Sequence, residues 1–202
     1  MKDFIYHSKP YVKANEVVGN SPMNLESEIL REHSKHQCLR IAKWIGADKK
    51  RFKELMVLFL RGDYRITQRA AWIVAHCADT HRELFLPYLD AMIDRMLEPG
   101  VHDAVKRNVV RVIQDIEIPP KLVGKIATVC FDMLSSVREP IAVRVFSMTV
   151  LANIARQEPD LKNEIRILVE QQMPTGSAGF RSRGSKILKQ LAAMEASIPR
   201  RG

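Results

Sequence analysis

Histidine and cysteine, which can bind zinc or act as a base and a nucleophile, gather in two short stretches, His33/His36/Cys38 and His76/Cys77/His81. A structural zinc site needs four convergent ligands, commonly in pairs with C-x₂₋₄-C or H-x₃₋₅-H spacing. Neither stretch supplies four, and an expected helix end separates His76 from His81. We therefore expect neither a metal site nor a cofactor.

Three carboxylates, Asp90, Asp94 and Glu98, recur every four residues and would share one face of a helix. Paired carboxylates can act as acid and base, but no histidine lies at ligand spacing beside them, so a solvated face is favoured. The chain also lacks a GxSxG elbow, a Walker loop, a GxGxxG turn and an HExxH pair. No catalytic residue is predicted, although an enzyme of an unrecognised type stays open.

The 202 residues carry a formal net charge of +9, which makes nucleic acid or an acidic protein a candidate partner. Residues 31–65 hold ten Lys or Arg against four Asp or Glu, residues 79–103 two against six, and residues 174–202 six against one. The chain is thus basic at both ends and acidic in the middle. No stretch approaches the roughly 20 apolar residues of a membrane span, so no membrane partner is expected.

The three cysteines, Cys38, Cys77 and Cys130, form no CxxC pair, and each falls at or near a helical core position. Buried, reduced thiols explain this pattern better than disulfides do. The N-terminal segment also lacks the uninterrupted apolar stretch of a secretory signal. These features predict a cytoplasmic protein.

A fixed period underlies most of the chain. Five twelve-residue windows align without gaps, at residues 34–45, 67–78, 105–116, 143–154 and 180–191, and their starts are 33, 38, 38 and 37 residues apart. In each window, positions 5, 6, 8, 9 and 12 are mostly apolar or small, which makes one continuous stripe on an α-helix. The pattern predicts an all-α array of about five repeats.

Each of the first four windows is followed by a second amphipathic stretch, at residues 48–60, 80–97, 119–134 and 159–173. Pro87 falls inside one of them, so we expect a kink or a broken first turn there. Asn24 suits an N-cap for a helix that extends through residues 25–33 into the first window.

The fifth window has no second stretch after it, so the last repeat is expected to be truncated. Residues 1–23 are expected to form an irregular arm, residues 24–196 a single repeat domain, and residues 197–202 a disordered tail.

The windows VRVFSMTVLANI (143–154) and VKRNVVRVIQDI (105–116) resemble the first helix of a HEAT repeat: a β-branched residue, a basic residue, two spacers, then small and apolar residues. The resemblance to the HEAT/armadillo family extends over about residues 34–191. It implies a right-handed α-α superhelix in which stacked helical pairs build one core, with the second helices on the concave side. HEAT-like stacks serve as scaffolds, transport receptors and some DNA-repair enzymes, so the resemblance does not name a function.

Surface positions next to the core columns of the second helices form rows that would span roughly 30 Å, which suits a peptide, a helix or a nucleic-acid backbone. Val57, Phe131 and Ile167 are apolar there although the core stripe does not need them. They could anchor a partner or pack against the N-terminal arm or a loop. The residues predicted to bind a partner are Lys53, Val57, Asp90, Asp94, Phe131, Arg166, Ile167 and Glu170.

Position 2 of the windows forms a nearly complete basic ladder of Lys35, Gln68, Lys106, Arg144 and Arg181. The ladder could bind phosphates, but pairing with acids of the neighbouring repeat is favoured, because Asp63, Asp103 and Glu139 lie just upstream of three windows. With two further cations of the last helix, the residues predicted to contact phosphate or an acidic partner are Lys35, Lys106, Arg144, Arg181, Arg183 and Lys186.

The leading hypothesis is a non-enzymatic scaffold that binds a macromolecule, in the first place a protein, along the concave face. The alternative is a nucleic-acid-binding protein with a role in DNA repair, because bacterial alkylpurine DNA glycosylases are similar in using a HEAT-like stack with a basic concave face. No tryptophan–aspartate–arginine set of that kind matches here, and the acidic middle would interrupt a phosphate track.

Overall fold

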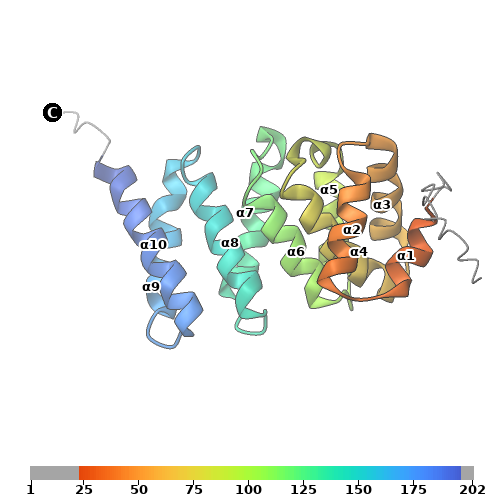
Figure 1. Cartoon of the computed structure of the whole chain (residues 1–202). Coiled ribbons are helices and arrows are strands. Elements are labelled where there is room, and N and C mark those ends of the chain that lie inside the picture. The colour runs from red at the N-terminus through yellow and green to blue at the C-terminus, as the bar shows by residue number, and fades with distance from the viewer. Residues whose placement is uncertain (1–22, 197–202) are drawn as a thin grey trace, which may run out of the picture.

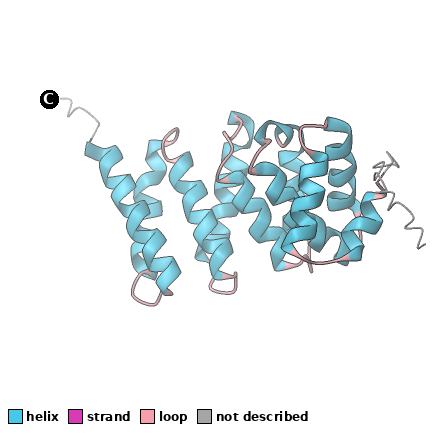
Figure 2. Ribbon diagram, in the orientation of Figure 1, coloured by secondary structure: helices cyan, strands magenta, loops and turns pink. Residues whose placement is uncertain are grey.

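The computed structural model describes residues 23–196, which form ten α-helices and three short 3₁₀ turns (Figure 1). No strand occurs within these residues, so the chain is all-α as the repeat pattern predicts (Figure 2). The predicted arm up to residue 22 and the predicted tail after residue 196 lie outside the described residues.

The five windows each coincide with one helix of a first row. Its members are α2 (Lys35–Ile45), α4 (Tyr64–Ala78), α6 (Asp103–Ile113), α8 (Ile141–Ile154) and α10 (Ala178–Ala196). The apolar stripe of each window enters the core, and in α6 this buries Val109, Val112 and Ile113. Buried apolar residues from Leu25 to Leu191 form one cluster, because each helical pair covers the apolar face of the next.

The second row consists of α3 (Lys49–Arg61), α5 (Leu89–Leu97), α7 (Pro120–Ser135) and α9 (Lys162–Gln172). The break expected at Pro87 is present. The chain there forms two 3₁₀ turns, η1 (Arg82–Leu84) and η2 (Leu86–Tyr88), and α5 begins only at Leu89. Proline has no amide hydrogen, so it fits a first turn but not a helix interior. A third turn, η3 (Pro159–Leu161), precedes α9.

The start of the array differs from the prediction. Asn24 does cap a helix, accepting the Ser27 amide hydrogen at 3.0 Å, but α1 (Leu25–Arg31) ends before the first window. Ser34 then accepts the Gln37 amide hydrogen at 3.1 Å and starts α2 as a separate helix. A serine hydroxyl in this position satisfies a free amide at a helix start, which favours a new helix over a continuous one.

The two rows differ in how closely their helices pack. Consecutive first-row helices contact one another along the whole array, whereas α5, α7 and α9 make few mutual contacts. Small buried residues such as Ala70, Ala71 and Ala75 in α4 permit the closer approach.

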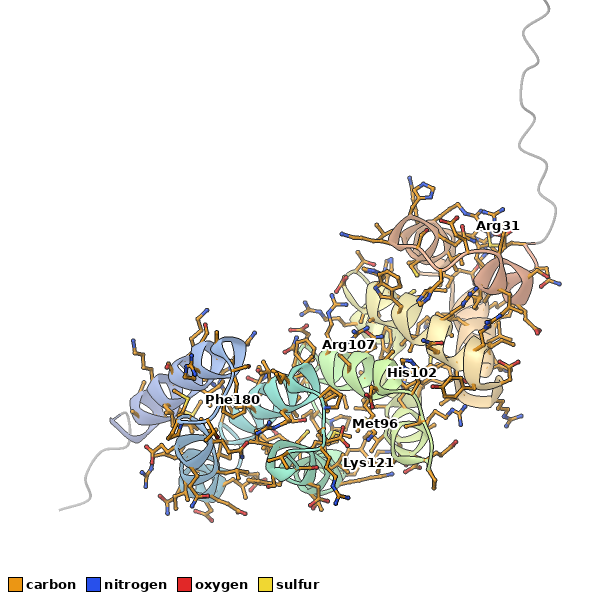
Figure 3. The ribbon with its side chains drawn as sticks, turned by 90° about the horizontal axis from the view of Figure 1, so that it is seen from below. Arg31, Met96, His102, Arg107, Lys121 and Phe180 are labelled. Carbon is orange, nitrogen blue, oxygen red and sulfur yellow. The ribbon has the colours of Figure 1, made fainter. Side chains whose placement is uncertain are left out.

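The more closely spaced row lies on the inside of a bend. Figure 3 looks along the helices and shows the first row on the inner side, with Arg107 on α6, and the second row on the outer side, with Lys121 on α7. The expectation that the second helices line the concave face is therefore wrong for this chain.

Candidate functional site

A groove opens where the outer helices α7 and α9 diverge. This hollow of about 580 Å³ has an apolar floor made by Phe131, Ile167 and Leu168. Ile167 is 41% exposed, and Phe131 is half-buried against the core. Two of the residues predicted as anchors thus meet in one place, although they come from different repeats. We call this hollow the α7–α9 groove.

Carboxylates form the rim of the α7–α9 groove. Asp132, Asp160 and Glu164 are exposed beside the apolar floor, and no Lys or Arg lines the groove. None of the three has an ion-pair partner among residues 23–196. Unpaired like charges around a recess raise the local concentration of cations, so the groove favours an apolar group with positive charge beside it.

The carboxylates Asp90 and Asp94, by contrast, are already neutralised. Each contacts Nζ of Lys125 at 2.6 Å, which ties α5 to α7. The hydrogen bonds to Asp90 and Asp94 raise the pKa of Lys125. Because these groups are largely solvent-exposed, each contact contributes only about 0–1 kcal/mol. Glu98 pairs with Arg95, so the acidic stripe seen in the sequence serves contacts within the fold.

The remaining residues of the predicted rows lie apart from the groove floor. Lys53 and Val57 are on α3, and Val57 is 48% exposed. Within α9, Arg166 Nη1 contacts Glu170 Oε2 at 3.1 Å. The predicted rows are therefore interrupted, and only the pair Phe131 and Ile167 converges.

The basic ladder connects neighbouring repeats. Lys106 Nζ lies 2.5 Å from Glu139 Oε1, just before the next first-row helix, as the structural interpretation predicts. Arg144 donates to Gln172 of its own repeat, and its guanidinium lies 5.1 Å from the ring centroid of Phe180, which belongs to the next repeat. Asp63 does not join the ladder, because its carboxylate caps α4 by accepting the Ile66 amide hydrogen at 2.8 Å.

The other candidate phosphate contacts are scattered. Arg181 donates to the Gly176 carbonyl at 2.6 Å, and Arg183 lies 3.3 Å from the Thr149 hydroxyl. Lys35 and Lys186 have no partner among the described residues, but they lie on α2 and α10, at opposite ends of the array. The six residues thus form no continuous track.

Charge is nevertheless divided between the two rows. The first-row helices contain thirteen Lys or Arg against two acidic residues, Asp103 and Glu195. The second-row helices α3, α5, α7 and α9 contain ten Lys or Arg against six Asp or Glu. The inner side of the bend is therefore the more positive one.

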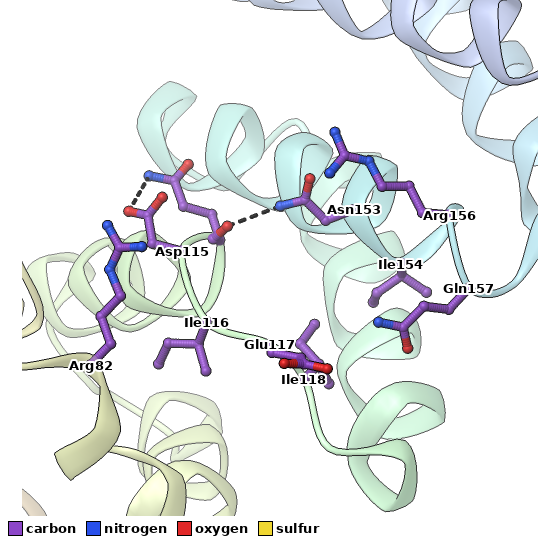
Figure 4. A pocket seen from close by; sticks show the side chains of 10 residues that line it. Arg82, Asp115, Ile116, Glu117, Ile118, Asn153, Ile154, Arg156 and Gln157 are labelled. Atoms are coloured by element: carbon purple, nitrogen blue, oxygen red, sulfur yellow. Dashed lines mark hydrogen bonds between the residues drawn. The ribbon is translucent and has the colours of Figure 1, made fainter.

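Another hollow, of about 380 Å³, lies between the segment that follows α6 and the end of α8 (Figure 4). The Asn153 side chain donates to the Gln114 carbonyl at 2.9 Å across one side of it. Two arginines and two carboxylates line this hollow: Arg82, Arg156, Asp115 and Glu117. These charges balance, so the hollow favours neither an anion nor a cation.

The cysteines are not poised for chemistry. Burial raises the pKa of Cys38 to about 11 and the pKa values of Cys77 and Cys130 to about 12, which keeps all three as thiols at neutral pH. Within residues 23–196, no group of three or more His, Cys, Asp or Glu is placed to hold a metal ion. Nor does any helix in this part of the chain have the length and apolar character needed to cross a membrane.

The stacked helical pairs and the continuous two-row core define an α-helical repeat protein. A family model described as a HEAT repeat domain matches residues 25–191, and the chain belongs to this HEAT repeat family. Comparison with curated proteins and with solved structures finds no match. HEAT repeats commonly mediate protein interactions, so the class is that of a helical-repeat scaffold or binding protein.

The rim of the α7–α9 groove was missed in the sequence. Asp160, Glu164 and Ile167 follow the i, i+4, i+7 spacing of a single helix face, and this signal could have associated the two acids with the anchor. Asp132 directly follows Phe131. Because Asp160 and Asp132 belong to different repeats, their shared rim depends on how α7 and α9 diverge.

Proposed function

We propose that this protein is a non-enzymatic binding module that holds a basic amphipathic helix of a protein partner in the α7–α9 groove. The observation that carries the proposal is the apolar floor of Phe131 and Ile167, open to solvent and rimmed by unpaired carboxylates. A groove of this kind receives apolar side chains spaced at i, i+3 and i+4, while cations on the flanks of the same helix meet the rim.

Charge decides the kind of helix. An acidic or purely apolar segment would leave Asp132, Asp160 and Glu164 without counter-charges, whereas lysine or arginine beside the anchors pairs with them. The groove also lies on the outer row, away from the first-row helices that carry the larger excess of Lys and Arg.

A direct binding assay uses a fluorescein-labelled synthetic peptide of about 18 residues, five helical turns, with leucine on one face and lysine on the other. A peptide of equal composition but scrambled order is the control. Fluorescence anisotropy of the full chain should show saturable binding to the amphipathic peptide and much weaker binding to the scrambled one. Added salt should weaken the complex, because the rim contacts are solvent-exposed.

Two matched variants locate the site. Ile167→Asp and Val57→Asp each place a charge at an exposed apolar position on the outer side, but only Ile167 lines the groove. Ile167→Asp should weaken binding by about tenfold or more, which corresponds to about 1.4 kcal/mol, while Val57→Asp should bind like the unchanged protein. Equal effects of the two variants would rule out the groove.

The N-terminal arm is the competing occupant, since it contains both apolar residues and lysines. A chain that lacks residues 1–22 separates the two cases. If the groove awaits a partner, this deletion leaves the peptide affinity unchanged. If the arm fills the groove, the deletion strengthens peptide binding, and the arm replaces an external partner in the proposal.

Nucleic-acid binding is the second candidate, and the excess of Lys and Arg on the first-row helices supports it. Anisotropy of a labelled DNA duplex should then fall steeply with salt, and the slope counts the phosphate contacts. Lys186→Ala on α10 should reduce that slope by about one contact, while Lys53→Ala on α3 should not. Absence of binding at about 50 mM salt would exclude this candidate.

A further inference from the structure

A hollow of about 370 Å³ lies between the first-row helices α4 and α6 and is also lined by His33, from the segment that joins α1 to α2. We call it the α4–α6 hollow. Its volume falls within the range of small-molecule sites. It is separate from the α7–α9 groove, and no Asp or Glu lines it.

An unsatisfied buried amide borders the α4–α6 hollow. Asn108 is only 3% exposed, and its Nδ2 has no hydrogen-bond partner among the described residues. A buried donor without an acceptor destabilises a fold, so native proteins keep few of them. The amide can rotate about its Cβ–Cγ bond, which would turn the donor toward an acceptor in the hollow.

A free cation stands beside this amide. Arg107 lines the hollow and is exposed, and its side chain has no hydrogen bond or ion pair with any residue of the described chain. Its guanidinium can donate two parallel hydrogen bonds to a carboxylate. Figure 3 shows Arg107 on α6 and His102 beside it, and His102 is the N-cap of that helix.

Other polar side chains of the hollow are already engaged. Nδ1 of His102 accepts the Ala104 amide hydrogen at 2.9 Å, so the neutral ring carries its own hydrogen on Nε2. That nitrogen lies 3.0 Å from the Gln68 amide, whose oxygen is the matching acceptor. These contacts hold α4 and α6 in register and leave Arg107 and Asn108 as the groups available to a ligand.

Aromatic rings form the apolar wall. Trp72 is half-buried in the hollow and meets the His33 ring edge-on, with 5.5 Å between ring centroids. Burial lowers the pKa of His33, and the positive charge of Arg69 lowers it further.

We infer that the α4–α6 hollow binds a carboxylate whose apolar or aromatic body lies against Trp72, with Arg107 and Asn108 donating hydrogen bonds to the carboxylate oxygens. One guanidinium and one neutral amide match a single negative charge. A phosphate monoester carries about −1.5 to −2 at pH 7, which one free cation would not neutralise. The carboxylate belongs either to a small molecule or to the C-terminus of a polypeptide.

Trp72 provides the readout. The chain has two tryptophans, so Trp44→Phe leaves Trp72 as the single reporter. Titration with phenylacetate should change its fluorescence saturably, whereas the uncharged analogue phenylacetamide should not bind. Phenyl phosphate should bind more weakly than phenylacetate. A peptide that ends in phenylalanine, compared with its amidated form, reports whether a polypeptide C-terminus is the better source of the carboxylate.

Two variants test the assigned donors. Arg107→Ala should weaken phenylacetate binding by about tenfold, whereas Arg156→Ala, which removes another exposed arginine without a partner in the described chain, should leave it unchanged. Asn108→Leu should weaken binding and raise the Tm by about 2–4 °C, because it removes the unsatisfied amide.

The inference is overturned if phenylacetate gives no saturable change, if Arg107→Ala binds as tightly as the unchanged protein, or if phenyl phosphate binds more tightly than phenylacetate. A lower Tm for Asn108→Leu would also count against it, because the amide would then be part of the packed framework. Preference for either the peptide or the small molecule supports the site and identifies the source of its ligand.

Discussion

The ion pair between Lys106 and Glu139 joins two repeats, and its removal from one side tests whether the basic ladder is structural. Lys106→Met keeps most of the apolar stem and removes the ammonium group. Glu139 is then left without a cation, although its side chain is only 16% exposed and its Oε2 already lacks a partner in the described chain. A mostly buried, uncompensated carboxylate should destabilise the array.

The size of the expected stability loss follows from how deeply the Lys106–Glu139 pair is buried. Breaking a fully buried pair costs about 3–5 kcal/mol, and breaking an exposed one about 0–1 kcal/mol. Lys106 and Glu139 lie between these limits, with side chains 23% and 16% exposed, so the expected loss is about 2 kcal/mol. In a domain of this size, that lowers the Tm by about 4–8 °C.

A double-mutant cycle with Lys106→Met, Glu139→Leu and the combined variant measures the coupling directly. The combined variant leaves no uncompensated charge in the fold. Its free energy of unfolding, measured in urea, should therefore recover most of the stability that Lys106→Met loses. Lys186→Met, which removes a cation without a partner in the described chain, is the control and should stay within about 0.5 kcal/mol of the unchanged protein. Strictly additive effects of the two substitutions would refute a structural role for the basic ladder. So would a Lys106→Met variant that keeps its Tm but no longer binds nucleic acid.

Three further predictions concern the fold. Gly124→Ala should stabilise α7 by about 1 kcal/mol, because a Cβ there meets open space. Gly184→Val should destabilise the protein by about 1–3 kcal/mol, because a Cβ there would lie 2.6 Å from Met173 Sδ. Thermal melting measures both effects. The hydrogen bond from Gln37, assisted by the charges of Arg40 and Arg31, holds the pKa of Glu28 below its ordinary value of 4.5. The ionised Glu28 therefore stabilises the folded state above that ordinary value, and this contribution is lost as the pH falls through the lowered pKa. When the pH is lowered from about 6 to about 3, the urea midpoint of Glu28→Gln should therefore fall less than that of the unchanged protein. A thiol reagent at pH 8 should modify the native protein slowly and the denatured protein completely at three positions, Cys38, Cys77 and Cys130.

The anchors show how far sequence reasoning reached into the candidate site. Phe131 and Ile167 stood out because each is apolar at a position that its own helix does not need for the core, which is a local property. Their meeting in one groove requires α7 and α9 to diverge, and no single repeat contains that information. Lys125 was missed for the same reason, because its contacts with Asp90 and Asp94 cross from one repeat to the next.

Hydrophobic periodicity by itself determined the number of first-row helices, their apolar stripes and the repeat period, because an α-helix sets its own 3.6-residue spacing from local backbone geometry. The side of the bend on which each row lies was decided only in the tertiary structure. Curvature depends on the difference in spacing between the two rows, and that spacing arises from side chains of neighbouring helices packing together. The same packing left Asn108 without an acceptor beside Arg107, a juxtaposition that spacing along the chain does not reveal.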